Sequence, residues 1–284
     1  MKTLLLVLKG VSLGRILPAC HFGLSGRHPG WLALALVLLS GCATQGQIDE
    51  SENTTGELGR EQRKSPAELY VNLGVAYWRN GQTAVALQKL NKAIAVDPEY
   101  AQAHNVIALI YQRLGETERA GEHYAQAVRL DPKDPDIRNA RGTYLCTQEK
   151  YDLAEIEFEN ALGNPLYPTP WVALTNAGLC AERAGAKEKA ETYYRRALTA
   201  NSTYPQALYQ MIEISLEQGN PLSARGYLER YNGVSAATAG SLWLGVQIER
   251  RLGDYRRANE YRTQLLKRFP DTLEIQLLKK SERE

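Results

Sequence analysis

The sequence predicts an all-α protein in which about six helix-turn-helix repeats stack into a right-handed superhelix. Turn-forming glycines recur at intervals of 34 residues on either side of one interruption, at Gly81, Gly115, Gly185, Gly219 and Gly253. The same helix stop, Asp-Pro, recurs after one period at Pro98 and Pro132. Proline ends a helix there because it lacks the amide hydrogen and restricts the residue before it. One helix pair cannot bury its apolar face alone, so repeats of this length stack on their neighbours.

Residues 1–41 are expected to be an export signal. Residues 31–39 form an unbroken apolar run, and Arg27 supplies a positive flank. The run is shorter than the roughly 20 apolar residues that a membrane-spanning helix needs, but it has the length of a signal-peptide core. The following Leu39-Ser40-Gly41-Cys42 resembles a bacterial lipobox, which implies cleavage before Cys42 and lipidation of its thiol. The alternative is a buried thiol after a core helix, and the long leader leaves the translation start open.

Residues 42–65 are expected to form a lipidated, flexible tether. Almost all of these residues are small or polar, so the segment cannot bury enough apolar surface to fold, and its r.m.s. reach is about 25 Å. The residue after Cys42 is alanine; aspartate there commonly signals retention in the inner membrane. The sequence therefore predicts an outer-membrane lipoprotein whose body faces the periplasm.

Residues 66–272 are expected to hold the six repeats, which resemble the tetratricopeptide repeat. In the first repeat, about 67–100, Gly74 and Ala86 stand where the two helices of a pair cross and small residues allow close approach. The others span about 101–134, 135–170, 171–204, 205–238 and 239–272. The third repeat has Glu149 in place of the turn glycine and a two-residue insertion near its end. The fifth repeat matches the consensus of the tetratricopeptide repeat only weakly. Residues 273–284 carry many charges and are expected to be a solvated extension.

Composition and motifs argue against catalysis and against nucleic-acid binding. The formal charge is +2 and falls to about −2 once residues 1–42, with four basic and no acidic residues, are removed. A nearly neutral chain without a basic block lacks the positive surface charge that binds the phosphates of a nucleic acid. No metalloprotease, phosphate-loop, Cys-x-x-Cys or hydrolase motif is present, so no enzyme, cofactor or metal is expected. His104 and His123 are assigned to packing or surface.

Two cysteines, Cys146 and Cys180, remain after the lipidation site and are 34 residues apart. Each lies in the first helix of its repeat, and successive first helices are neighbours in this fold. A disulfide is one interpretation, favoured by an oxidising periplasm. Two buried reduced thiols are the other. A disulfide needs Cα atoms within about 7 Å of each other. The cysteines occupy the twelfth and tenth places of their repeats, and this difference leaves open whether their Cα atoms come that close.

A partner-binding groove is expected on the inner wall made by the first helices. In this fold, places two, five, nine, twelve and thirteen of each repeat point into the groove. In the first two repeats these places include Val71, Val75, Trp78, Arg79, Asn105, Leu109, Gln112 and Arg113. Apolar surface rimmed by polar groups is typical of a partner site, with Trp78 as an anchor and the arginines as carboxylate binders. The alternative is that Trp78 packs as ordinary core.

Several segments resemble the type IV pilus biogenesis and stability lipoproteins, the PilF/PilW family. They are residues 67–77, 131–142, 144–146, 151–155 and 176–180, and the match covers about 42–275. The resemblance implies a pilotin, which binds the secretin subunit of the pilus and promotes its localisation and multimerisation in the outer membrane, as twitching motility requires. A monomer is expected. The alternatives are a scaffold of another envelope machine, such as a peptidoglycan hydrolase adaptor or the β-barrel assembly machinery, and an enzyme or regulator of cell-wall synthesis.

Overall fold

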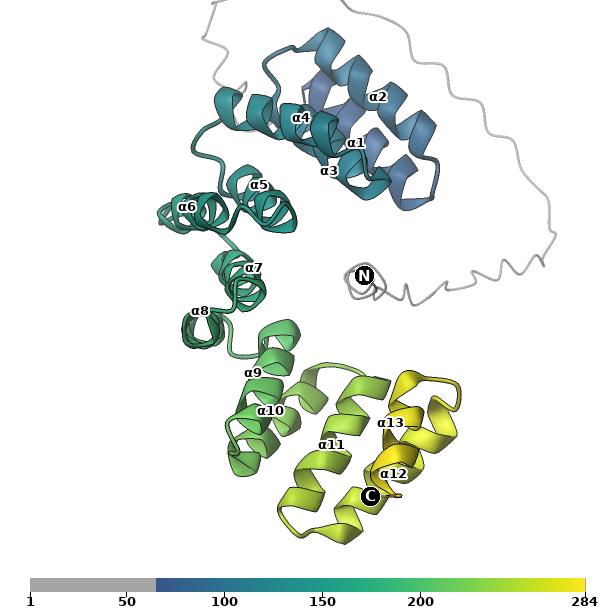
Figure 1. The fold of residues 1–284 in the computed structure, drawn as a ribbon. Coiled ribbons are helices and arrows are strands. Elements are labelled where there is room, and N and C mark those ends of the chain that lie inside the picture. The colour runs from purple at the N-terminus through teal and green to yellow at the C-terminus, as the bar shows by residue number, and fades with distance from the viewer. Residues whose placement is uncertain (1–64, 284) are drawn as a thin grey trace, which may run out of the picture. The chain divides into compact units, whose positions relative to one another are not determined.

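The computed structural model describes residues 65–283; the expected signal peptide, Cys42 and the tether up to residue 64 lie outside that range. All regular secondary structure within the described residues is helical, as predicted (Figure 1). The helices are α1 Pro66–Arg79, α2 Thr83–Val96, α3 Ala101–Leu114, α4 Thr117–Leu130, α5 Pro135–Thr147, α6 Tyr151–Leu162, α7 Pro170–Arg183, α8 Lys187–Ala200, α9 Pro205–Glu217, α10 Pro221–Val234, α11 Ala239–Arg251, α12 Tyr255–Arg268 and α13 Leu273–Ser281.

Helices α1–α12 form six pairs, each with a first helix A and a second helix B. The two helices of a pair pack most extensively on each other, and each B helix also contacts the A helix that follows it. A helices touch their successors as well, at α1 with α3, α3 with α5, α5 with α7 and α9 with α11. Figure 1 follows this order from α1 to α12. The predicted stacking of tetratricopeptide helix pairs is confirmed.

The turns between A and B helices explain the glycine spacing. Gly81, Gly115, Gly185, Gly219 and Gly253 all have positive φ angles, between 70° and 80°. Glycine takes this left-handed conformation without steric penalty. Glu149 holds the same turn in the third repeat at φ 59°, and no other non-glycine residue in the range 65–283 has a positive φ. The interruption in the glycine pattern is therefore a substitution within an unchanged turn.

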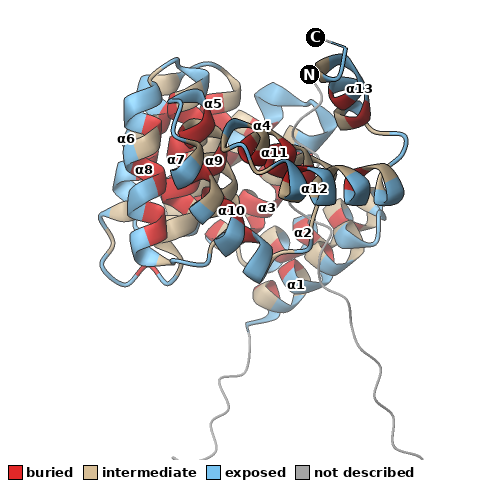
Figure 2. Ribbon diagram, turned by 90° about the horizontal axis from the view of Figure 1, so that it is seen from below, coloured by how far each residue is buried: buried red, intermediate tan, exposed pale blue. Residues whose placement is uncertain are grey.

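Close approach of helices A and B explains the small residues at the eighth place. A Cβ atom added to Gly178 would lie 2.5 Å from the ring of Tyr194, and one added to Gly142 would lie 2.8 Å from Phe158. Both aromatic side chains are almost completely buried. Figure 2 shows the buried positions on the helix faces that pack together and the exposed positions on the outer faces. The core thus runs along the stack, between and within the pairs.

The C-terminal segment corrects one expectation. Residues 273–281 form α13, whose Ile275 and Leu278 are 4% and 1% exposed and pack in a cluster with Leu242, Val246 and Leu265. The prediction of a solvated extension is therefore wrong for this segment, because two aliphatic side chains three residues apart share one face of a short helix. α13 covers apolar surface of the last pair, as end-capping elements of repeat proteins do. No helix between residues 65 and 283 has the length and hydropathy of a membrane span.

Candidate functional site

The predicted groove corresponds to one surface of the A helices, here called the A-helix wall and defined by places two, five, nine, twelve and thirteen of each repeat. Its first part lies on α1 and α3. Val75, Trp78 and Leu109 are half-buried and pack on the main core cluster. Trp78 therefore combines the two roles that its sequence position left open: part of the ring supports the core and part remains accessible. The three side chains give the wall an apolar surface that a partner can cover.

Val71 and Asn105 are not open to a partner, and for them the prediction is wrong. Val71 is 7% and Asn105 is 6% exposed. The two residues occupy the fifth places of repeats one and two, on α1 and α3, which pack directly on each other. Asn105 Nδ2 donates a hydrogen bond to Gln102 Oε1 at 3.3 Å. These two residues therefore support the A-helix wall rather than line it.

Polar groups border the apolar part of the wall. Arg79 and Arg113 are exposed in the last turns of α1 and α3, and neither forms an ion pair with another described residue. Their guanidinium groups can bind carboxylates of a partner in a bidentate manner. Gln112 is half-buried, and its Oε1 accepts a hydrogen bond from the Tyr124 hydroxyl at 2.7 Å. The wall therefore has an apolar centre and a cationic rim.

Cys146 on α5 and Cys180 on α7 form a disulfide, with Cα atoms 5.7 Å apart. Both side chains are buried, at 4% and 5% exposure. The difference between the twelfth and tenth places is accommodated because α5 and α7 lie side by side. The bridge joins repeats three and four across the segment that carries the two-residue insertion.

His104 on α3 and His123 on α4 lie together, which was not predicted. Their Nδ1 atoms are 3.0 Å apart. Burial lowers the pKa of both imidazoles, and for His104 the neighbouring His123 adds to this effect. One neutral ring can therefore donate to the other. The two positions are 19 residues apart, a spacing that links the A and B helices of one repeat and could have indicated the contact.

An acidic cluster on the A-helix wall of repeats four and five was also missed. Glu182 occupies the twelfth place of its repeat, and Glu213 and Glu217 the ninth and thirteenth places of the next. Burial, then Glu182, then Glu217 raise the pKa of Glu213 to about 7. Lys187 Nζ on α8 pairs with Glu217 Oε2 at 2.7 Å, whereas Glu213 forms no ion pair with another described residue. Counting the same places in later repeats would have found the cluster.

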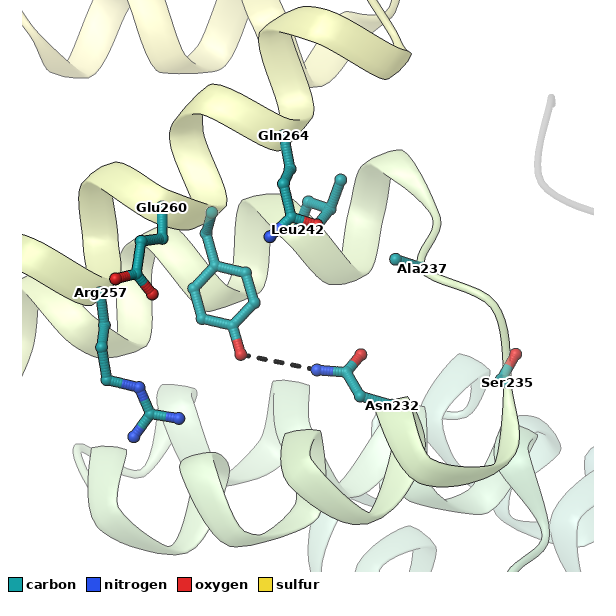
Figure 3. A pocket seen from close by; sticks show the side chains of 8 residues that line it. Asn232, Ser235, Ala237, Leu242, Arg257, Glu260 and Gln264 are labelled. Carbon is teal, nitrogen blue, oxygen red and sulfur yellow. Dashed lines mark hydrogen bonds between the residues drawn. The ribbon is translucent and has the colours of Figure 1, made fainter.

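A polar hollow lies between α10, the start of α11 and α12. Its volume is about 320 Å³, and its walls include Asn232, Arg257, Glu260 and Gln264 (Figure 3). Several of these groups already have partners: Asn232 Nδ2 donates to the Tyr261 hydroxyl at 3.5 Å, and Arg257 pairs with Glu229 at 3.1 Å. The hollow is formed mainly by B helices and lies outside the places that define the A-helix wall.

No arrangement in the described part of the chain resembles a metal site: residues 65–283 contain no group of three or more His, Cys, Asp or Glu side chains placed to hold an ion. The histidine pair lacks a third ligand and a neighbouring nucleophile. The side chains along the A helices form an extended surface with apolar, cationic and acidic regions. Such a surface is suited to binding protein segments.

Comparisons with known proteins support this fold and identify proteins of similar sequence and structure. A tetratricopeptide-repeat family profile matches residues 71–135 and 139–205. The type IV pilus assembly protein PilF of Pseudomonas aeruginosa is 29% identical over 243 residues, which are 86% of this chain and 94% of PilF. An uncharacterized protein of Haemophilus influenzae is 35% identical over 121 residues, covering 43% of this chain and 68% of that protein.

Two solved structures match most of the helical stack. PilW, described as a widely conserved type IV pilus biogenesis factor, has a TM-score of 0.68 at 30% identity, covering 76% of this chain and 99% of PilW. The structure of P. aeruginosa PilF has a TM-score of 0.70 at 27% identity, covering 76% of this chain and 97% of that one. The similarity therefore spans nearly the whole of both relatives and is not confined to one or two repeats.

Proposed function

The chain belongs to the PilF/PilW family of tetratricopeptide-repeat proteins of type IV pilus biogenesis, and from this premise we propose that it is a pilotin. In this proposal it binds the secretin subunit of the pilus, promotes secretin localisation and multimerisation in the outer membrane, and thereby supports twitching motility. The observation that carries the proposal is the near-complete match to PilF and PilW, two proteins whose names and descriptions refer to pilus assembly and biogenesis.

The membrane attachment in this proposal rests on Cys42, which lies outside the described residues. The lipobox-like Leu39-Ser40-Gly41-Cys42 supports acylation of this cysteine. One acyl chain gives marginal binding, so the three chains of a bacterial lipoprotein make attachment effectively stable. Cys42→Ser should leave a folded protein in the soluble periplasmic fraction and lower the amount of secretin multimer. Continued fractionation of the variant with the outer membrane would show that lipidation is not the anchor.

The surface that binds secretin in this proposal is the A-helix wall of repeats one and two. Trp78 and Leu109 are accessible in part, and Arg79 and Arg113 extend beside them without an ion-pair partner in the described chain. A segment with apolar anchors and a neighbouring carboxylate would match these groups. Binding by such a wall needs no catalytic group, in keeping with the tetratricopeptide fold.

The experiment compares two double variants in cells that assemble pili. Trp78→Ala with Leu109→Ala removes the apolar centre of the wall. The control, Leu222→Ala with Tyr255→Ala, removes two apolar side chains of the B helices that are 67% and 73% exposed. The wall variant should stay folded by circular dichroism and lose secretin multimer and twitching, while the control keeps both. A folded wall variant with full secretin assembly would overturn the assignment.

A further inference from the structure

A second hollow opens between repeats three and four, on surfaces that the A-helix wall does not include. Its volume is about 140 Å³, and a cavity of about 150 Å³ is large enough to hold benzene. Alanines of α7 and the following turn and the buried Cys180 form its floor, aromatic rings form its walls, and charged groups form its rim. The lining residues are Tyr151, Asp152, Glu155, Phe158, Ala177, Cys180, Ala181, Ala184, Ala186, Lys189 and Tyr193.

The hollow exists because two side chains of repeat four are small. Ala177 and Ala181 occupy the seventh and eleventh places. In repeat two these places hold Ile107 and Tyr111, which are 1% and 8% exposed and fill the corresponding space in the core. Protein interiors are normally packed without such gaps. An apolar hollow that stays open to the surface is therefore a candidate site for a side chain from outside.

The walls of the hollow are held in place by their own contacts. The Tyr193 hydroxyl donates to Glu159 Oε1 at 2.9 Å, and Lys189 Nζ pairs with Glu155 Oε1 at 2.5 Å. The disulfide from Cys180 to α5 ties the floor to the preceding repeat. A preformed site loses little conformational freedom when it is filled, which favours binding.

Two features beside the hollow indicate what fits it. Asp152 on the rim is exposed and forms no ion pair with another described residue. Ile156, one turn further along α6 on the side of Asp152, is 55% exposed. An exposed aliphatic side chain and an unpaired carboxylate therefore stand next to each other at the rim of the hollow. Its complement is an apolar side chain with a basic residue close to it.

We propose that this hollow is a second docking point, which receives one apolar side chain, of leucine to phenylalanine size, from a protein segment that also places a lysine or arginine beside Asp152. The site goes beyond the proposed function, because none of its lining residues is at a place that defines the A-helix wall. It gives the protein two separate attachment points, one on the A helices of repeats one and two and one between repeats three and four.

The test uses a phage-displayed library of random 12-residue peptides, selected in parallel on the full chain in mild detergent and on variants. Ala181→Leu fills the hollow, and Ala177→Val fills it less. Ala125→Leu adds the same side chain as the first variant at an exposed position of α4. Asp152→Asn removes the rim charge at an exposed position, where replacement does not disturb packing. The wall variant Trp78→Ala with Leu109→Ala separates this site from the proposed secretin site.

Peptides selected by the wild type and lost on Ala181→Leu should carry an apolar residue next to a lysine or arginine. Their affinity should fall at least tenfold in Ala181→Leu, partly in Ala177→Val, and stay within twofold in Ala125→Leu and in the wall variant. The melting temperature of Ala181→Leu should be unchanged or higher, because the added atoms occupy empty space. Asp152→Asn should reduce the preference for basic residues. Identical selections on the wild type, Ala181→Leu and Asp152→Asn would overturn the proposal, whatever the result for secretin.

Discussion

Cys146 and Cys180 are joined across two successive A helices, one repeat period apart in sequence and 5.7 Å apart at their Cα atoms. The bond closes a loop of 34 residues, which contains the only insertion in the repeat pattern of residues 66–272. It therefore fixes the junction where the regular spacing of the repeats is broken.

Reduction of this disulfide should destabilise the protein. A closed loop of this size contributes about 3–4 kcal/mol in the chain-entropy model. We expect a lower melting temperature in the presence of reductant, and the same decrease without reductant for Cys146→Ser with Cys180→Ser. Thiol labelling of the unfolded, unreduced chain checks the bond itself. Two reactive thiols per chain from these positions would show that the cysteines are free.

Replacing Gly178 should be much more harmful than replacing another helical glycine. A Cβ atom at Gly178 would meet the Tyr194 ring at 2.5 Å, whereas one at Gly226 on α10 would meet nothing within 4 Å. Gly178→Ala should lower the free energy of unfolding by about 1–3 kcal/mol through overpacking. Gly226→Ala should raise it by about 0.5–1 kcal/mol, because alanine favours the helix. Urea denaturation measures both, and equal effects would contradict the close packing.

Glu249 should be a critical charged residue of the last two repeats. It is 0% exposed, its Oε1 accepts a hydrogen bond from Arg225 Nε at 3.0 Å, and Arg257 Nε lies 3.8 Å from the same oxygen. Glu249→Gln leaves two arginines without their buried counter-charge and should cost about 3–5 kcal/mol of stability.

The control for this prediction is an exposed ion pair on the neighbouring helix α12, the B helix of the same repeat. Glu260 pairs with Arg256 at 2.6 Å, one turn away on the surface of α12. Glu260→Gln should change the free energy of unfolding by less than about 0.5 kcal/mol. The two variants are compared by denaturant titration at neutral pH. A mild effect of Glu249→Gln would mean that the buried cluster contributes little.

Glu213 should make stability depend on pH. Its pKa rises from 4.5 to about 7 in the folded protein, through burial and the nearby Glu182 and Glu217. The folded state therefore binds the proton more tightly than the unfolded state does. The resulting stabilisation is complete below the unfolded pKa and is lost as the pH rises through about 7.

Comparison with Glu213→Gln isolates this contribution from other titrating groups. Between pH 5 and pH 8 the wild type should lose about 1–2 kcal/mol relative to the variant, a range reduced for the partial exposure of the side chain. Chemical denaturation at several pH values gives the difference. A wild type and variant that change in parallel over this range would show that the carboxyl titrates normally.

Local backbone chemistry made much of this fold predictable. Gly115 and Gly185 could be assigned to turns because the left-handed conformation favours glycine, and Gly178 to a helix crossing because small residues allow close approach. Side-chain burial between repeats was less predictable. Val71 is buried by the neighbouring A helix, and this depends on how closely two repeats pack. Periodicity within one helix does not determine that distance.

Two other features were hard to predict from the sequence because charged residues usually indicate exposed positions. The lysines at the end of α13 suggested a solvated segment, although Ile275 and Leu278 bury one face of it. Glu249 is charged but completely buried, because its partners Arg225 and Arg257 come from neighbouring helices. Both features depend on residues that only the folded chain brings together. The hollow beside Ala181 could have been found from the sequence by comparing equivalent places between repeats.

The central claim, that the A-helix wall binds the secretin subunit, is tested most directly by site-specific photo-crosslinking in piliated cells. A photoreactive amino acid replaces Arg113 on the wall in one strain and Thr192, exposed on the B helix α8, in another. We expect the Arg113 position to form an adduct that contains the secretin subunit and the Thr192 position to form none. Adducts with secretin from Thr192 alone, or from neither position in cells that assemble pili normally, would contradict the account.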